Sequence, residues 1–442
     1  METSPSFSFA PACAPARPLR VHVLVDLAWA PAAGGHVKVW ERLAGAAIGM
    51  TDRLDLTVHF SGAAPATHLL GTNVRFRVHR PVFSTARLPF LAHVPDHTDR
   101  ARHHRGLAAH LGDADVLHTT DAYFAFARTA ERIARRRRVA LVSSVHTDTP
   151  RYTALFTAQT VERALGRGGL GRALVRLCNE RWSVPGRAEV SMRRRLLAHQ
   201  RRCDCALVSR PEELERLARA LSPDRVGLLR RGIDHALFSP ARRDRAWLEE
   251  TFGVPRDRLV VLFVGRLDRG KNVLTLVEAV RALASEGWPL HLLCAGAGPD
   301  RAIILDRLPG AASCPGVLAP ATLARTYASA DLLAHPSEIE ECSNVVLEGL
   351  ASGLPVLASA GAGRAIASDQ IGVVVRGAGV GPWAAALRAL CDDGPRRTAL
   401  ARAARRFAEE SIPSWADVLA QDLLPLWTKA VLRQREGGEE GR

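Results

Sequence analysis

The first half of the chain alternates short apolar runs with segments of helical length. An apolar run at 19–29 is followed by a glycine pair and by apolar residues at helical spacing over 37–49. The further runs that predict buried strands are 54–60, 115–120, 139–146 and 205–210. This alternation favours a parallel sheet that is covered by helices on both faces.

The same alternation starts again after residues 230–240. Apolar runs predict strands, and the amphipathic segments between them predict helices. The strands are expected at 258–267, 289–299, 331–337 and 355–359, and the helices at 272–287, 321–330 and 344–353. The segment 411–434 predicts a pair of amphipathic helices that is broken near Pro425. Two successive α/β units are therefore expected, with a linker within 211–236.

The length of 442 residues exceeds the size at which one hydrophobic core usually keeps growing, which also indicates two domains. We expect a flexible tail at 1–19, a first Rossmann-like domain at 20–228 and a second one at 229–412. A helical segment at 413–435 and a disordered tail at 436–442 complete the expected organisation. A cleft between two such domains is a common place for a ligand.

The net charge of +15 favours an anionic partner. Nucleic acid, acidic lipid headgroups and a phosphorylated substrate all fit this charge, and the charge alone does not choose among them. Solvated arginines on helix faces explain the same excess without any partner. No recognisable nucleic-acid-binding module accompanies the charge, so nucleic acid is not expected as a partner.

Eight cysteines are scattered along the chain, and Cys203 and Cys205 have only one residue between them. This pattern indicates neither a disulfide framework nor a zinc site, so we expect a reducing cytoplasm and no metal. The first twenty residues lack a basic start followed by an apolar stretch, and no later segment approaches about 18 apolar residues. We therefore expect neither an export signal nor a membrane-spanning helix.

Two carboxylates lie in the segment from His335 to Ser359, HPSEIEECSNVVLEGLASGLPVLAS. Ser343 or Asn344 is suited to cap the helix that carries Glu348, and Glu340 precedes this cap. Backbone N–H groups at a helix start favour phosphate, and carboxylates accept hydrogen bonds from sugar hydroxyls. On spacing alone, a solvated loop followed by an ordinary capped helix is an alternative.

The pattern PSxxE followed by NVVLEGLASGLPV resembles the nucleotide-sugar motif of retaining glycosyltransferase family 4. The resemblance implies a GT-B fold, in which an acceptor domain and a donor domain, both Rossmann-like, face each other across a cleft. It also implies a C-terminal helix that crosses back to the first domain. Glu340 would contact the donor sugar and Glu348 the ribose, while Ser343, Asn344 and Val345 would help to bind the donor.

The segment GRLDRGKNVLTLVEAV at 265–280 resembles the phosphate-binding segment of the same family. The resemblance implies that Arg266 and Lys271 neutralise the donor diphosphate. Fixed cations at that place stabilise the negative charge that develops on a leaving phosphate. Two further segments, 230–240 and 295–299, resemble the linker of the family and the approach to its glutamate motif.

The resemblance extends to the first half of the chain. Gly34 and Gly35 match a glycine loop whose backbone approaches the donor phosphates. The segment VSSVHTDTPRYT resembles the one that presents a histidine to the donor sugar and the acceptor, which nominates His146. Asp148 and Tyr152 are assigned more loosely to the acceptor. A structural hydrogen-bonding role is the alternative for this histidine.

The resemblance implies a hexosyl-type transferase that moves a sugar from a nucleotide diphosphate donor to a hydroxyl acceptor with retention of configuration. In this family the leaving phosphate is considered to help deprotonate the acceptor, and the nucleotide sugar is a co-substrate. Because no metal cluster is recognisable in the sequence, no cofactor is expected. Glu341, Cys342 and Ser343 stand where many relatives have Gly-Phe-Gly. This departure leaves a second hypothesis open, a non-catalytic nucleotide-sugar-binding partner or sensor on the same scaffold.

Arginines cluster at 132–138 and at 187–202, where apolar residues are interleaved with them. One hypothesis is that this face docks on anionic lipid at the inner side of a membrane and brings a lipid-linked or cell-envelope acceptor to the enzyme. A solvated surface is the alternative.

Overall fold

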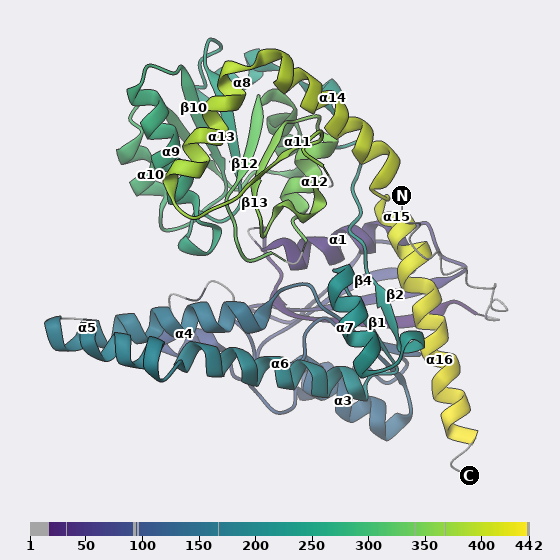
Figure 1. The fold of residues 1–442 in the computed structure, drawn as a ribbon. Helices are drawn as coiled ribbons and strands as arrows, with labels where there is room; N and C mark the ends of the chain where they lie inside the picture. Colours follow the sequence, from purple (N-terminus) through teal and green to yellow (C-terminus); the bar gives the residue numbers. More distant parts are fainter. Residues whose placement is uncertain are drawn as a thin grey trace. The chain divides into compact units, whose positions relative to one another are not determined.

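The computed structural model describes residues 17–439, except residues 32, 92, 93, 95, 96, 167, 341 and 367. The chain forms two compact units. Unit 1 comprises the residues up to Arg230 together with those from Ala416, and unit 2 comprises Arg231–Trp415. Each unit is an α/β structure built on its own sheet (Figure 1).

Unit 1 contains an eight-stranded sheet in the order β3-β4-β2-β1-β5-β6-β7-β8. Only β3 runs antiparallel to its neighbour. The strands are β1 (Leu19–Ala28), β2 (Leu54–Ser61), β3 (Ala66–Leu69), β4 (Val74–His79), β5 (Val116–Thr119), β6 (Ala140–Ser144), β7 (Cys205–Val208) and β8 (Val226–Leu228). The five strands expected for this half are confirmed, and β3, β4 and β8 were not expected.

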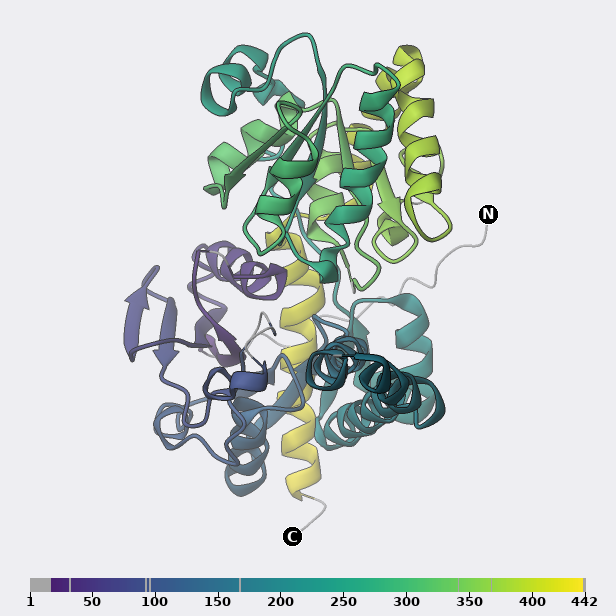
Figure 2. The ribbon, with the colours of Figure 1, turned by 90° about the vertical axis from the view of Figure 1, so that its left-hand side faces the viewer.

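The helices of unit 1 include a long hairpin beside the sheet. The helices are α1 (Gly35–Ala47), α2 (Arg105–Ala108), α3 (Ala125–Arg137), α4 (Thr149–Leu165), α5 (Gly168–Arg176), α6 (Val184–Arg202) and α7 (Pro211–Ala220). Helices α4 and α6 lie side by side, and α5 lies at the end of this hairpin that is farther from the sheet (Figures 1 and 2). A π-turn, η3 (Leu177–Arg181), leads from α5 towards α6.

The expected linker at 211–236 is wrong for most of its length. Pro211 occupies the first turn of α7, where its missing N–H costs no helical hydrogen bond. Strand β8 then pairs with β7 at the edge of the sheet. This segment therefore completes unit 1, and the chain passes into unit 2 only after Arg230.

The C-terminal segment returns to unit 1. It consists of α15 (Trp415–Val418), the π-turn η8 (Leu419–Leu423) and α16 (Leu424–Glu439). Helix α16 packs against β5, β6 and β7, and Leu423, Trp427 and Ala430 are buried there. The crossing-back helix implied by the resemblance is confirmed.

The expected break of this segment near Pro425 is wrong, because the helix continues through the proline. Proline lacks an N–H and crowds the carbonyl of the residue four positions earlier. The wider π-turn immediately before Pro425 accommodates that ring without ending the helix. The helix also extends to Glu439, into the expected disordered tail. Once a helix has formed, adding one more residue to its end costs little free energy.

Unit 2 contains a parallel six-stranded sheet in the order β11-β10-β9-β12-β13-β14. The strands are β9 (Leu259–Val264), β10 (Leu290–Ala295), β11 (Ala312–Gly316), β12 (Leu332–His335), β13 (Val356–Ser359) and β14 (Val373–Val375). The helices are α8 (Arg245–Phe252), α9 (Val273–Ser285), α10 (Arg301–Arg307), α11 (Pro320–Ser329), α12 (Asn344–Ala351), α13 (Val380–Asp392) and α14 (Gly394–Ser411). The four strands and three helices expected from periodicity are confirmed.

The sheet of unit 2 separates two hydrophobic cores. Along β9, Leu262 belongs to one core and its neighbours Val261 and Phe263 belong to the other. Successive side chains of a strand point to opposite faces, so a fully apolar strand has helices on both sides. This arrangement leaves the loops at the carboxyl ends of the strands as the place where polar groups gather.

Candidate functional site

Lys271 and Glu340 meet at the carboxyl edge of the sheet in unit 2. Strands β9 and β12 are neighbours, and the loops that follow them carry these two residues. The Nζ atom of Lys271 lies 2.5 Å from Oε1 of Glu340, and Nε2 of His335 lies 3.4 Å from the same oxygen. The structure therefore brings a lysine and a glutamate that are 69 positions apart into one ion pair.

The loop after β9 is held by Asp268. Its carboxylate accepts a hydrogen bond from the backbone N–H of Lys271 at 3.0 Å and one from Nε of Arg266 at 2.9 Å. The loop after β10 fits closely against it, because a Cβ at Gly296 would collide with the carbonyl oxygen of Gly265. Gly296 also has a φ of 152°, so this position favours glycine for two reasons.

Glu340 is a largely buried carboxylate, with 15% of its side chain exposed. Burial alone would raise its pKa, but the charge of Lys271 and the hydrogen bond with His335 outweigh burial and hold the pKa well below its usual value. The carboxylate is therefore ionised at neutral pH and is able to accept hydrogen bonds from a ligand.

Helix α12 begins beside this ion pair. Ser343 is its N-cap, and its hydroxyl accepts a hydrogen bond from the N–H of Val346 at 3.4 Å. Asn344 and Val345 are the first two helical residues, so their backbone N–H groups belong to the positive end of the helix dipole. Sequence reasoning left Ser343 and Asn344 open as caps, and the structure selects Ser343.

Glu348 lies one turn inside α12 and is only 4% exposed. Tyr327, on α11, donates a hydrogen bond from its hydroxyl to Oε2 of Glu348 at 2.9 Å. The tyrosine orients the carboxylate and was not singled out from the sequence, because a lone tyrosine in a helix 21 positions away gives no local signal.

The structure describes two of the three residues at 341–343 that depart from the family pattern. Glu341 lies outside the described residues. Cys342 packs against the hydrophobic core of unit 2, and Ser343 caps α12 as described above. Two of the three substituted residues thus have structural roles.

The remaining predicted site residues belong to unit 1. Gly34 is the N-cap of α1 and Gly35 is its first residue, and no side chain caps this helix start. Asp148 caps α4 by accepting a hydrogen bond from the N–H of Arg151 at 3.1 Å. Tyr152 stacks on Phe156 in α4.

His146 follows β6 and is 7% exposed. Its Nε2 atom lies 2.7 Å from Oγ of Ser144 and 3.2 Å from Nε1 of Trp40 on α1. The ring of His36 stacks on it, with 4.6 Å between the ring centroids. The sequence nominated His146 but not these neighbours, and two of them, His36 and Trp40, lie on α1, far from His146 in the sequence.

Neither a metal site nor a membrane span is present in the described part of the chain. It contains no group of His, Cys, Asp or Glu side chains that could hold a metal ion. Among the helices of these residues, none is both long enough and apolar enough to cross a bilayer.

Residues 258–393 match the family described as glycosyl transferases group 1. A D-inositol 3-phosphate glycosyltransferase of Thermomonospora curvata is 30% identical over 353 residues, which cover 74% of each chain. A protein of the same name from Rhodococcus erythropolis is 33% identical over 229 residues, which cover 49% of this chain and 51% of that protein. The match thus spans about half the length of the Rhodococcus relative.

Solved structures resemble most of the chain in fold. HepE of Anabaena, in complex with UDP, has a TM-score of 0.61 at 15% identity and covers 91% of this chain and 98% of its own. Sucrose-phosphate synthase of Thermosynechococcus elongatus has a TM-score of 0.64 at 18% identity and covers 95% of this chain and 100% of its own. The fold of the chain is GT-B.

Proposed function

The chain belongs to the glycosyl transferases group 1 family, and on that premise we propose that it transfers a sugar from a nucleotide diphosphate donor to a hydroxyl acceptor with retention of configuration. The observation that carries this proposal is the ion pair of Lys271 and Glu340 beside the start of α12. Cation, ionised carboxylate and helix N-terminus lie together at the carboxyl edge of a parallel sheet, where such folds bind ligands.

Each group of this site matches one part of a nucleotide sugar. When the bond between the sugar and the diphosphate breaks, negative charge develops on the leaving phosphate, and Lys271 and Arg266 stabilise it. The N–H groups of Asn344 and Val345 favour the same phosphate. Glu340 accepts hydrogen bonds from a sugar hydroxyl. Glu348, oriented by Tyr327, accepts them from the ribose.

We propose an acceptor that carries both a hydroxyl and a phosphate. The relatives quoted above are named for D-inositol 3-phosphate, and the net charge of +15 favours an anionic acceptor. A lipid-linked acceptor at a membrane would also carry a hydroxyl and a phosphate. No metal or cofactor is part of this proposal, because the side chains described above supply the charge stabilisation.

Release of nucleotide diphosphate from a panel of nucleotide sugars tests the proposed activity. The donors are UDP, GDP and ADP sugars, each with D-inositol 3-phosphate or with a phosphate-linked lipid as acceptor. We expect acceptor-dependent release with one donor. Donor binding without release in every combination would contradict the activity and favour the non-catalytic sensor.

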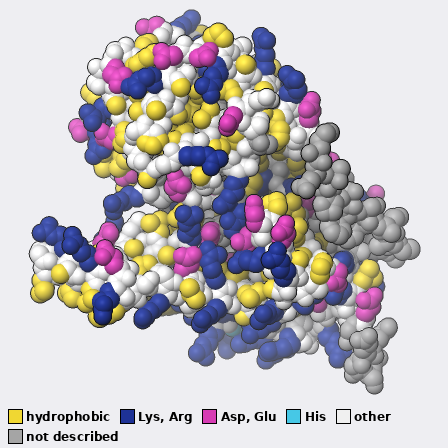
Figure 3. Space-filling model, viewed as in Figure 1, with side chains coloured by type: hydrophobic (Ala, Val, Ile, Leu, Met, Phe, Trp, Pro, Cys, Tyr) yellow, Lys and Arg dark blue, Asp and Glu magenta, His cyan; other side chains and the backbone are white. Residues whose placement is uncertain are grey.

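The end of the helical hairpin in unit 1 supports docking on an anionic membrane. Leu170 is 79% exposed and Trp182 is 48% exposed, and exposed arginines at 172, 176 and 181 lie between and beside them. Figure 3 shows hydrophobic and basic side chains together at this end. Apolar side chains that enter the headgroup region, together with cations, are the features by which proteins bind anionic lipid.

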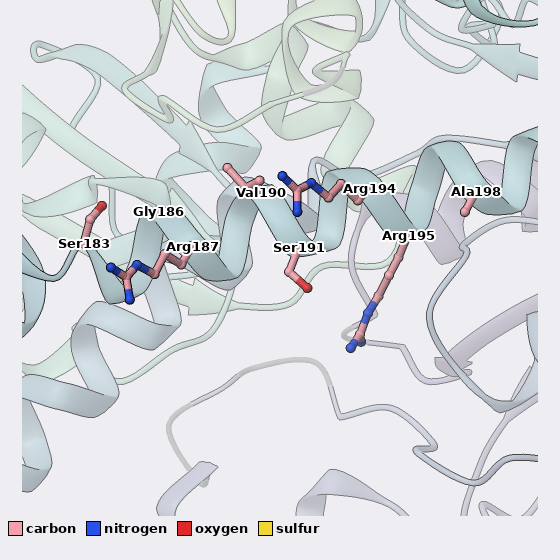
Figure 4. A pocket seen from close by; sticks show the side chains of 8 residues that line it. All are labelled: Ser183, Gly186, Arg187, Val190, Ser191, Arg194, Arg195 and Ala198. Carbon is pink, nitrogen blue, oxygen red and sulfur yellow. The ribbon is translucent and has the colours of Figure 1, made fainter.

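A hollow along α6 continues the same basic surface. It has a volume of about 700 Å³, and Arg187, Arg194 and Arg195 line it together with Val190. Figure 4 shows that the lining side chains come from α6 and from Ser183 just before it. An anionic headgroup fits such a lining by charge. We propose that the hairpin holds the protein at the inner face of a membrane, near a lipid-linked acceptor.

Vesicle co-sedimentation tests this docking. Replacing Arg172 and Arg176 by glutamine should weaken binding to vesicles of phosphatidylglycerol about thirtyfold, at about 1 kcal/mol for each cation. Leu170→Ser should also weaken it. Leu69→Ser changes an equally exposed leucine on β3 and should have no effect. Equal recovery of the wild-type protein with neutral and anionic vesicles would contradict the proposal.

A further inference from the structure

A chain of hydrogen bonds runs through the interior of unit 1 from the C-terminal helix to His146. Nε1 of Trp427, on α16, lies 3.0 Å from Nδ1 of His118 on β5. Nε2 of His118 lies 2.8 Å from Oγ of Ser144, which lies 2.7 Å from Nε2 of His146. Nε1 of Trp40 reaches the same nitrogen of His146 at 3.2 Å.

An indole donates at each end of this chain, and this fixes the direction of every bond within it. An indole nitrogen donates and never accepts. Nδ1 of His118 must therefore accept from Trp427, so the proton of this neutral ring is on Nε2. That nitrogen donates to Ser144, which leaves the hydroxyl hydrogen of Ser144 to be donated to His146.

The bond from Trp40, at the other end of these hydrogen bonds, independently shows that Nε2 of His146 is an acceptor. Trp40 donates to Nε2 of His146, so this nitrogen carries a lone pair and no proton. Two donors, one indole and one hydroxyl, thus converge on a single ring nitrogen. We propose that Trp427, His118 and Ser144, together with Trp40, are positioning residues that hold His146 as the neutral tautomer with its proton on Nδ1.

The side chains that form these hydrogen bonds are buried, which keeps water from competing for their donors and acceptors. Trp40, His118 and Trp427 are fully buried, and Ser144 is 1% exposed. Burial lowers the pKa of His118 to about 3, so this ring stays neutral at physiological pH. A protonated His118 would place a hydrogen on Nδ1 against the N–H of Trp427, which is a clash of two donors.

The tautomer decides what His146 does for a ligand. Its only ring proton is on Nδ1, so a nitrogen contact with a sugar or phosphate oxygen is a donated hydrogen bond. Its Nε2 atom is occupied by two donors and is not available as a base. The catalytic consequence rests on the proposed function, whereas the tautomer itself does not.

Nitrogen NMR of the full-length protein labelled with ¹⁵N-histidine tests the tautomer directly. His146→Gln identifies the resonances of this ring by their loss. In the wild-type protein we expect a signal typical of an unprotonated nitrogen at Nε2 and one typical of a protonated nitrogen at Nδ1. A protonated Nε2 would overturn the inference. The tautomer is read from the wild-type protein, and His146→Gln serves only to assign its signals.

Variants then test the two donors. Ser144→Ala together with Trp40→Phe should release Nε2 of His146, so that the spectrum shows a mixture of tautomers. Trp427→Phe should release His118 but leave His146 unchanged, because Trp40 still donates to it. Trp383→Phe, a buried tryptophan of unit 2, is the matched control and should change neither ring. An unchanged His146 in the double variant would overturn the role of the two donors.

Activity is a separate readout. If sugar transfer is found, Ser144→Ala should lower kcat about fivefold, which corresponds to the loss of one hydrogen bond, with little change in KM for the donor. If no sugar transfer is found but the tautomer is as stated, the proposed function fails and the inference stands.

Discussion

Lys271 and Glu340 form a largely buried ion pair at the carboxyl edge of the sheet in unit 2. Their side chains are 17% and 15% exposed, so removing either one would take the countercharge away from a largely buried group. In the ligand-free chain the ammonium is paired with the carboxylate. A bound diphosphate would compete for this ammonium, while a sugar hydroxyl would take up the freed capacity of the carboxylate.

Lys271→Ala should lower kcat about 100-fold to 1000-fold, because the lost charge stabilises a leaving group whose own charge grows during the reaction. Steady-state kinetics of nucleotide release measure this change. Arg281→Ala, on the exposed face of α9, is the matched control and should leave kcat unchanged. An unchanged kcat in Lys271→Ala would remove the assignment of this lysine to the phosphate.

The same pair gives a control for folding. Lys271→Met removes the countercharge of the buried Glu340 carboxylate and should destabilise unit 2 by about 3 kcal/mol, whereas Lys271→Met with Glu340→Gln removes both charges and should restore most of this stability. Activity should stay low in both variants. Urea unfolding and kinetics together therefore separate a loss of charge at the site from a loss of structure.

At the scale of elements, three adjacent strands of unit 1 form a ladder of buried histidines. His22 on β1, His59 on β2 and His79 on β4 face one another, with 3.0 Å and 2.9 Å between their facing ring nitrogens. Burial lowers the pKa of His22 and of His79 to about 4 in each case, and nearby arginines add to the effect. The unfolded chain restores an ordinary value of 6.5.

Unit 1 should therefore lose stability as the pH falls from 6.5 to about 4. In this window the unfolded rings bind protons and the folded ones do not, so each ring lowers the free energy of unfolding by about 1.4 kcal/mol per pH unit. Urea unfolding at several pH values measures the slope. His79→Gln should make the slope shallower, and His68→Gln, an exposed histidine on β3, should not. An equal slope in all three proteins would contradict this account.

Sequence periodicity predicted the strands that are continuous apolar runs and missed those that are not. All four residues of β3 are exposed, so no buried side was available to mark it. β4 alternates buried Val74, Phe76 and Val78 with Arg75 and Arg77, a period of two that could have been recognised. The helix break expected at Pro425 was wrong because the effect of a proline depends on the geometry of the preceding helical turn. Local sequence does not show that this turn is a π-turn.

The candidate site likewise contains residues that the sequence located and residues that it missed. Motifs located Glu340, Glu348, Arg266 and Lys271, because these residues lie in contiguous segments with a characteristic order. Tyr327, the partner of Glu348, and the tryptophans Trp40 and Trp427, which reach His146 directly and through His118, were missed because they lie on other helices. Which side chains meet depends on strand order and register, and local sequence contains neither.

For the whole molecule, the two units differ in how the chain builds them. Unit 2 is one continuous segment, whereas unit 1 needs α16 from the end of the chain. Leu419, Leu423, Leu424 and Trp427 are buried in the C-terminal segment. At about 2 kcal/mol for each buried side chain, their removal approaches the whole stability of a typical domain.

Residues 231–415 expressed alone should therefore fold, and residues 17–230 alone should not. Thermal unfolding and dispersed ¹H–¹⁵N spectra measure both outcomes. Adding residues 416–439 to the second fragment should restore cooperative unfolding, because it supplies the missing side of the core. A cooperative transition in residues 17–230 alone, at the temperature of the intact unit, would show that the C-terminal helix is dispensable.

The return of α16 to unit 1 also sets an order of events during protein synthesis. Domains generally fold as they leave the ribosome, with the N-terminal one first. Here the sheet of unit 1 leaves first but lacks the helix that covers β5, β6 and β7 until about 190 further residues have been translated. Unit 2 is thus the first to be complete. Until α16 is translated, one face of the sheet stays uncovered, and transiently exposed apolar surface of this kind is what makes a newborn chain prone to aggregation.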